Sequence, residues 1–167
     1  LKCYEIPEGD KTSKGRAIQN LLNIDADDSV NAFLRVKGLN DADFIKNHFI
    51  VFATKNGTVK KTSLEAYSRP RTNGVNAITI AEGDEVVDVR LTNGKNELIM
   101  ANRNGRAVRF NESTIRTMGR TATGVRGMRL DGGDDEVIGM ITVNDASTET
   151  VMVVSEQGYG KRSLVED

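Results

Sequence analysis

Basic side chains recur in register along this chain, and they are its clearest candidates for binding chemistry. Three similar segments each place a Lys or Arg four positions after a glycine: Lys61, Arg109 and Arg162. The three glycines are separated by 48 and then by 53 residues. Positive side chains at such intervals suit the phosphates of duplex DNA, which form a line of charge that needs no particular base sequence. The alternative is that Lys and Arg only keep exposed strand edges from pairing.

The net charge conceals a separation of bases from acids. The chain has a formal net charge of −1, which by itself argues against a polyanionic partner. Between residues 103 and 129, however, there are seven arginines and one acid, Glu112. Between residues 55 and 71 there are five bases and one acid, Glu65. Charge separated in this way produces a basic surface on a nearly neutral protein.

The candidate contacts to DNA come from these two stretches and from the last glycine segment. Each is expected to supply charge to phosphates, and none to read bases. They are Lys60, Lys61, Arg69, Arg71, Arg103, Arg106, Arg109, Arg116, Arg120, Arg126, Arg129, Lys161 and Arg162.

Catalytic and metal sites have little support. The single histidine, His48, has no Ser or Cys nucleophile placed with it, and Cys3 is interpreted as a small buried residue of a first strand. One cysteine excludes an internal disulfide and suits a reducing cytoplasm. The acids at 25–28 and 131–136 lack the alternating spacing of a calcium loop and are typical of tight turns. We expect no catalytic residue and no metal site.

The glycine segments predict the elements that position the bases. Each begins with an apolar stretch (FIVFA, ELIMA or TVMVV), turns at its glycine and continues into a basic strand, as in a β-hairpin. Strand geometry puts Val108 and Phe110 on one face and Arg109 on the other, so Arg109, Lys61 and Arg162 are expected to face solvent. A strand repeat of about 50 residues predicts an array of small sheets, because one such sheet cannot bury its own apolar face.

A second recurring segment completes each repeat. Residues 71–89 align with 121–140, which places Ile78 and Ile80 on Met128 and Leu130, an alternation typical of a half-buried strand. We therefore expect about four strands in each repeat. In the connections, Asn111 or Ser113 is expected to cap a short helical turn, and Asn40 to Asn47 is expected to be a surface loop.

The domain organisation follows from these repeats. The chain is expected to be a single partial domain over residues 1–167, with approximate repeats 1–64, 65–112 and 113–167. It begins and ends at similar stages of a repeat, which favours a piece of a longer polypeptide. No apolar run approaches the roughly 20 residues needed to cross a bilayer.

Several motifs together resemble a known family. NGTVKKTSL (56–64), GDEVVDVRLT (83–92), NGRAVRFNEST (104–114), TGVRGMRL (123–130) and GYGKRSLVE (158–166) resemble the C-terminal domain of the A subunit of bacterial DNA gyrase, in the order of that family. The related A subunit of topoisomerase IV is the alternative. The resemblance implies an all-β fold, a β-pinwheel in which neighbouring four-stranded blades exchange strands. About three blades of a normally six-bladed disc would lie in this chain.

The resemblance also implies a function. In the family this disc wraps DNA around its basic edge, so that ATP-driven strand passage introduces negative supercoils. The implied partners are duplex DNA and the rest of DNA gyrase, meaning the remainder of its A subunit together with its B subunit. The implied location is the bacterial cytoplasm at the nucleoid, without a membrane. ATP and Mg²⁺ would serve the holoenzyme, and no cofactor would bind this segment.

One family feature is missing from the sequence. The heptapeptide box resembling Gln-Arg-Arg-Gly-Gly-Lys-Gly is absent, and TSKGR (12–16) and TGVRG (123–127) occupy equivalent loops. The tyrosines Tyr4, Tyr67 and Tyr159 lack a strand-cleaving constellation and are interpreted as packing residues. A propeller-like protein-interaction scaffold or a module that only completes the disc stays an alternative, and open blade edges would favour self-association.

Overall fold

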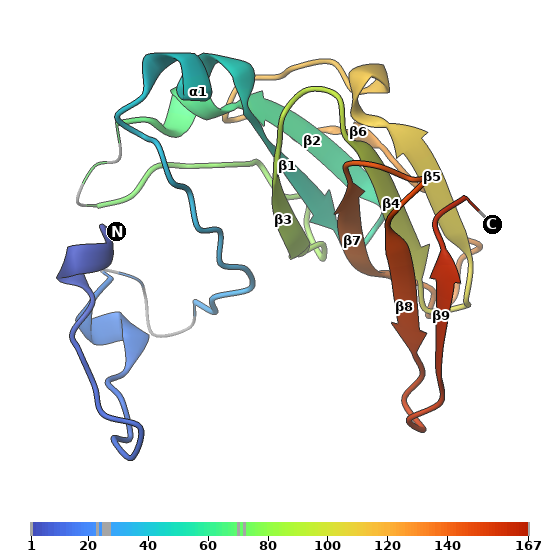
Figure 1. Ribbon diagram of the computed structural model, residues 1–167, viewed down its shortest axis with the longest axis horizontal. Helices are drawn as coiled ribbons and strands as arrows, with labels where there is room; N and C mark the ends of the chain where they lie inside the picture. Colours follow the sequence, from blue (N-terminus) through green and yellow to red (C-terminus); the bar gives the residue numbers. More distant parts are fainter. Residues whose placement is uncertain (1, 23, 25–27, 70, 72, 167) are drawn as a thin grey trace.

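The computed structural model describes every residue except 1, 23, 25–27, 70, 72 and 167. The sheets follow one another along an arch, and the N-terminal segment lies apart from them (Figure 1). The strands are β1 (Phe49–Thr54), β2 (Thr58–Ser63), β3 (Val86–Thr92), β4 (Glu97–Asn102), β5 (Ala107–Asn111), β6 (Val125–Arg126), β7 (Val137–Val143), β8 (Thr150–Val154) and β9 (Gly160–Leu164). The helices are α1 (Ala42–Asn47) and the short 3₁₀ helices η1 (Cys3–Glu5), η2 (Ile18–Asn20), η3 (Leu64–Tyr67) and η4 (Glu112–Thr114).

All three predicted glycine hairpins form. They are the antiparallel pairs β1–β2, β4–β5 and β8–β9. Gly57, Gly105 and Gly158 have φ angles of 86°, 81° and 84°, in the left-handed region that a residue with a Cβ rarely adopts. The glycine of each segment therefore decides where the chain reverses.

Each larger sheet combines a hairpin with strands from later in the chain. The first has the order β3-β1-β2-β6 and the second the order β5-β4-β7, while β8 and β9 pair with each other. β6 follows the second hairpin in the chain but pairs with β2 of the first, through Thr58↔Arg126 and Val59↔Val125. The first sheet thus takes β3 from the repeat predicted at 65–112 and β6 from that predicted at 113–167, an exchange of strands between repeats as the family resemblance implied.

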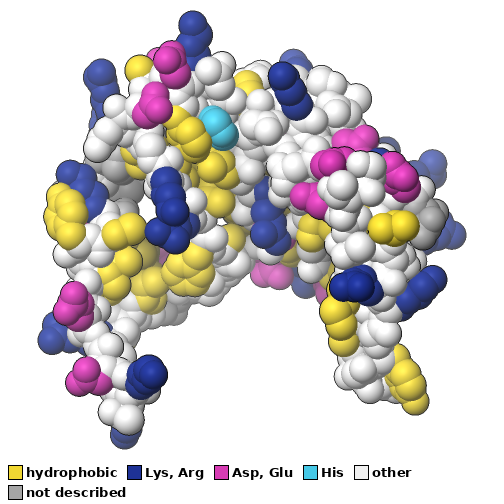
Figure 2. Space-filling model, in the orientation of Figure 1, with side chains coloured by type: hydrophobic (Ala, Val, Ile, Leu, Met, Phe, Trp, Pro, Cys, Tyr) yellow, Lys and Arg dark blue, Asp and Glu magenta, His cyan; other side chains and the backbone are white. Residues whose placement is uncertain are grey.

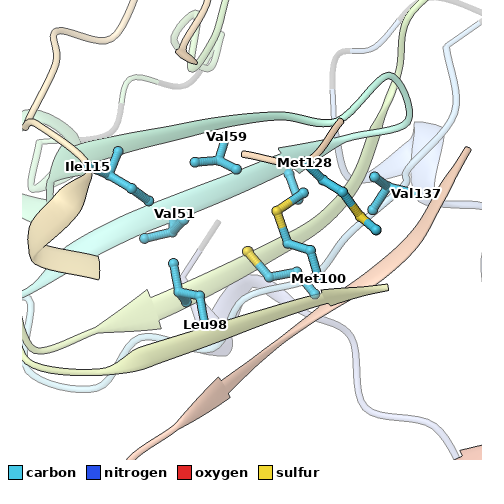
Figure 3. Close-up of a cluster of buried hydrophobic side chains, with 9 residues drawn as sticks. Val51, Val59, Leu98, Met100, Ile115, Met128 and Val137 are labelled. Atoms are coloured by element: carbon cyan, nitrogen blue, oxygen red, sulfur yellow. The ribbon is translucent and has the colours of Figure 1, made fainter. Parts of the chain in front are cut away.

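The main core lies between the first two sheets. Val51 and Val59 of the first sheet pack with Leu98 and Met100 of the second, and all four are at most 1% exposed (Figure 3). Met128, from the segment that follows β6, joins the same cluster. Methionine is unbranched and flexible, which suits it to the space between two sheets. This apolar layer joins the two repeats.

A smaller core corrects the prediction for residues 40–47. Ile50, Phe52 and Leu64 form a second buried cluster, and Phe44 packs against it. Residues 42–47 are the helix α1 rather than a loop, because the side chain of Asp41 accepts hydrogen bonds from the backbone N–H groups of Asp43 and Phe44. Phe44 is apolar and packs on the second cluster, a contact that the interpretation of these residues as a surface loop did not include.

The connections between repeats behave mostly as predicted. Asn111 caps η4 by accepting a hydrogen bond from the backbone N–H of Ser113, which confirms the short helical turn. The half-buried strand predicted around Ile78 and Ile80 is wrong, since residues 73–80 contain no strand and Ile80 is 44% exposed. The aligned Met128 and Leu130 are not in a strand either, because pairing with β2 is limited to Val125 and Arg126, the two residues of β6.

The close approach of residues 123–128 to the first hairpin yields a testable prediction. A Cβ on Gly127 would overlap Val59 Cγ1 and lie 2.9 Å from Met100 Sδ. Gly127→Ala is therefore expected to lower the free energy of unfolding by about 1–3 kcal/mol through overpacking. Urea unfolding measures this. Gly119→Ala is the control, because nothing lies within 4 Å of its Cβ; equal losses in both variants would contradict the packing account.

Candidate nucleic-acid interface

The structure divides the predicted basic residues into groups with different surroundings. Lys60 and Lys61 are buried, and Arg120 is half-buried. Arg103, Arg106 and Arg109 are exposed residues paired with carboxylates. Among the described residues, no carboxylate pairs with the exposed Arg69, Arg71, Arg116, Arg126, Arg129, Lys161 and Arg162. Lys and Arg side chains project at many points around the arch (Figure 2).

Lys61 does not face solvent, so that part of the prediction is wrong. It is 5% exposed, and its Nζ lies 2.9 Å from Glu112 Oε2. The ammonium also lies 4.4 Å from the centre of the Phe49 ring. On β2, Lys61 shares a face with Val59, and that face is covered by the second sheet. The alternation of apolar and basic residues along β2 could not show that both faces of this strand are covered.

Glu112 completes this buried ion pair. Its carboxylate accepts hydrogen bonds from Thr92 Oγ1 at 2.8 Å and from the backbone N–H of Asn96 at 2.9 Å. Glu112 is fully buried and stands seven residues after the second hairpin glycine, where the other hairpins have Leu64 and Val165. The pair therefore links the first sheet to the second at a position that is otherwise apolar.

Lys60 points to the opposite face of β2 and is also enclosed. Its Nζ donates hydrogen bonds to the backbone carbonyl oxygens of Ala77 and Arg120, the second at 2.6 Å. Burial, together with the nearby Arg120 guanidinium, lowers the pKa of Lys60 to about 8. Lys60 thus ties the two connecting segments to β2 and is not placed to reach a phosphate.

The exposed paired arginines offer less free charge than the sequence suggested. Arg106 Nη1 lies 2.9 Å from Asp131 Oδ2, and Arg109 Nη2 lies 2.7 Å from Glu97 Oε2. Arg103 pairs with Glu136. The pKa of the Glu136 carboxyl is lowered, mainly by a hydrogen bond from Lys55 and also by the charge of Arg103. Acids of the 131–136 turn therefore neutralise bases of the second hairpin.

Arg126 and Arg129 form the best-defined group of free positive charge. They flank Met128, which is buried in the main core, while both arginines are exposed. The backbone N–H groups of Gly127 and Met128 donate to the carbonyl oxygen of Gly57 at 2.9 and 3.1 Å. The two guanidinium groups therefore extend from a segment that is fixed at both its backbone and its core side chain.

These arginines border an open depression next to the first hairpin. The depression has a volume of about 460 Å³ and is lined by Asn56, Arg126, Met128, Arg129 and Leu130. Two cations and an amide side chain suit a phosphate group. Sequence reasoning missed Asn56, although an amide precedes the glycine of every hairpin: Asn56, Asn104 and Gln157.

The described residues give no support to a metal site or to base catalysis by His48. No three His, Cys, Asp or Glu side chains of the described part are grouped to hold a metal ion. Asp25 and Asp27, two of the acids at 25–28 that were compared with a calcium loop, lie outside the described residues. Asp135 instead accepts a hydrogen bond from Asn102 Nδ2, and His48 Nδ1 is bonded to the carbonyl of Phe44.

Some single-residue interpretations need correction. Cys3 is exposed in η1 rather than buried in a strand. Tyr4 and Tyr159 are 78% and 79% exposed, so their interpretation as packing residues is wrong, whereas Tyr67 is half-buried and donates to the carbonyl of Ala77. Among the described helices, none is long and apolar enough to cross a membrane.

Comparison with known proteins decides the family. A sequence model described as the DNA gyrase C-terminal domain, beta-propeller, matches residues 1–37, 48–93, 96–144 and 149–167. The chain belongs to this family. The all-β propeller fold expected from the resemblance is confirmed. The chain is 42% identical over its full length to the DNA gyrase A subunits of Staphylococcus aureus strains MRSA252 and NCTC 8325, and it spans 18% of those proteins.

Solved structures agree with this assignment. A C-terminal domain of DNA topoisomerase IV is 34% identical with a TM-score of 0.76, and the match covers 89% of this chain and 44% of that domain. A DNA gyrase A C-terminal domain has a TM-score of 0.78 at 23% identity, with 97% of this chain and 49% of that domain covered. The second likeness supports the fold alone.

The enclosed Lys60 predicts a dependence of stability on pH. Its folded-state pKa of about 8 lies below the ordinary value of 10.5, so the unfolded chain binds more protons between these values. The free energy of unfolding should therefore rise with pH from 8 toward 10, where the burial-raised pKa of Tyr67 begins to oppose it. Urea unfolding across this range should show the rise in the wild type but not in Lys60→Met. The exposed Lys161→Met is the control and should keep the rise.

The buried pair of Lys61 and Glu112 predicts strong coupling. Lys61→Met and Glu112→Leu each leave one buried charge without its partner, which is expected to cost about 3–5 kcal/mol of unfolding free energy. The double variant removes both charges and should be more stable than either single variant. Thermal unfolding of the four proteins measures the coupling. Additive losses would show that the two side chains act independently.

Proposed function

We propose that this chain binds duplex DNA without sequence preference through its exposed arginines. The observation that carries the proposal is the pair Arg126 and Arg129, held beside Asn56 at an open depression with no carboxylate pairing them among the described residues. Because the backbone between them is already held by Gly57 and the core, binding a phosphate has to order only the two arginine side chains. The family membership supports a nucleic-acid partner because the matched relatives are parts of DNA gyrase and DNA topoisomerase IV.

The contacts proposed for DNA are narrower than the predicted set. Lys60 and Lys61 are assigned to packing, and the carboxylates beside Arg103, Arg106 and Arg109 reduce their attraction for phosphate. The remaining contributors would be the half-buried Arg120 and the exposed Arg69, Arg71, Arg116, Arg126, Arg129 and Lys161.

Within a larger protein, this binding would bend DNA around the arch. We propose that the chain acts as a non-catalytic wrapping region within a DNA gyrase, alongside the rest of its A subunit and its B subunit. Wrapping would then allow an ATP- and Mg²⁺-dependent type II topoisomerase to introduce negative supercoils. The chain spans 18% of its curated relatives, so the breaking and rejoining of strands is assigned to the other parts.

A second function is favoured by the apolar surface of the last hairpin. Met152, Val153 and Val154 of β8 are 67%, 65% and 58% exposed. A contiguous exposed apolar strand is typical of a protein contact. This surface would complete the disc or join another polypeptide, and it is compatible with DNA binding elsewhere.

Charge-removing variants test the DNA proposal. The variant R126Q/R129Q should bind a random-sequence duplex of about 40 bp more weakly than the wild type in about 50 mM salt. If each arginine neutralises one phosphate, the slope of log K against log salt should become shallower by about 1.8. Fluorescence anisotropy over a salt series measures both quantities.

The matched control is K46Q/K95Q, which removes the same charge from exposed residues. Lys46 in α1 precedes β1 and Lys95 precedes β4, so both lie at the strand ends opposite the hairpin turns. The control should keep the wild-type slope. Salt-independent binding, or an equal loss in both double variants, would contradict a phosphate site at Arg126 and Arg129.

A further inference from the structure

The basic residue that follows each hairpin glycine makes a recurring contact with the next repeat. Lys61 Nζ donates a hydrogen bond to the backbone carbonyl oxygen of Glu112 at 3.3 Å. Arg109 Nη1 donates to the backbone carbonyl oxygen of Val165 at 2.6 Å. Each donor stands four residues after its own hairpin glycine, and each acceptor stands seven residues after the glycine of the next hairpin. The same contact therefore joins two successive pairs of repeats.

The acceptor residue is fixed within its own hairpin. The backbone N–H of Glu112 donates to the carbonyl of Asn96 at 2.9 Å, and that of Val165 donates to the carbonyl of Glu149 at 3.1 Å. Leu64 makes the equivalent bond to His48 at 2.9 Å in the first hairpin. The residue thus closes its own hairpin through N–H, which leaves its carbonyl oxygen to accept from the preceding repeat.

The charge of each donor is balanced in a different way. Lys61 forms its ion pair with the carboxylate of the acceptor residue itself, Glu112. Arg109 instead pairs with the carboxylate of Glu97, on the adjacent strand of its own hairpin. The position equivalent to Glu97 is Phe49 beside Lys61, where the ring contacts the ammonium. In both pairs of repeats the basic side chain donates to a backbone carbonyl of the next hairpin, but the carboxylate that balances its charge comes from a different place. The contact to the backbone is therefore the shared feature.

We propose that the basic residue four positions after each hairpin glycine is a connector that positions the next repeat, rather than a contact to a polyanion. Lys61 and Arg109 perform this role between the three hairpins of the chain. Arg162 is the third member and is exposed on β9. It is the docking point for one more repeat of the same kind, whose acceptor carbonyl would meet it as Val165 meets Arg109.

The surface around Arg162 fits such an occupant. β8 and β9 pair with each other alone among the described strands, whereas β1 and β2 each have a second neighbour. Tyr159 and Leu164 of this hairpin are 79% and 49% exposed, but their repeat equivalents Thr58 and Ser63 are half-buried at the ends of β2. The interface that joins the first two repeats thus continues onto the third hairpin with its basic residue in place.

Hydrogen exchange on the whole chain tests the connector role. Arg109→Gln removes the donor to the Val165 carbonyl, so the end of the third hairpin should open more often. Exchange of the Val165 amide, which is bonded to Glu149, should then speed up by about 10-fold, and the β1–β2 amides should be unchanged. Arg109→Lys keeps the charge and a donor and should restore most of the protection. A general loss of stability would instead speed exchange in every sheet, and that result would count against a local connector.

Two controls separate the connector from its charge. Glu97→Gln removes the ion pair but keeps the donor to Val165, so exchange there should stay slow. Arg162→Gln changes the same position in the third hairpin and should alter no amide in this chain. If Arg109→Gln leaves Val165 protected and instead makes the salt slope of DNA binding shallower by about 0.9, Arg109 contacts phosphate and the proposal is overturned.

Discussion

A short β-hairpin cannot by itself pair the backbone groups at its two edges or bury the apolar side chains on its faces. The arrangement of the repeats follows from this constraint. The first hairpin gains β3 on one edge and β6 on the other, and β6 comes from beyond the second hairpin. The carbonyl of Gly57 fixes the incoming segment by accepting from Gly127 and Met128. Since the shared strand and the shared core belong to two repeats at once, the packing of one repeat depends on the placement of its neighbour.

The sharing of strands between repeats also decides which basic side chains are buried and which are exposed. When a strand has neighbours on both edges and both faces, a lysine within it must find a partner inside the protein. Lys61 pairs with the carboxylate of Glu112 in η4, directly after the second hairpin. Lys60 donates to two backbone carbonyl oxygens, and its burial lowers its pKa. Both side chains hold neighbouring segments together through their hydrogen bonds, although burial disfavours the charged form of Lys60. Free charge remains in the connecting segments, where Arg126 and Arg129 are exposed.

Local patterns in the sequence predicted the local structure well and the tertiary environment poorly. The hairpins and the Asn111 cap could be predicted because turn glycines and capping side chains act within a few residues. The burial of Lys61 could not, since it depends on Glu112 some fifty residues later. The strand predicted at Ile78 failed for the same reason: alternation describes a face, but a strand also needs a partner edge.

The position of the candidate interface depends on the core beneath it. Met128 packs in the cluster that contains Met100 of β4 (Figure 3). Arg126 pairs through its backbone with Thr58 of β2. The segment that carries the exposed arginines is therefore held by both sheets. Any change in the angle between the sheets would move these guanidinium groups relative to those of the next repeat. A stiff polyanion meets cations along a fixed path, so their spacing matters as well as their number. The packing between repeats therefore also sets the geometry of the candidate interface.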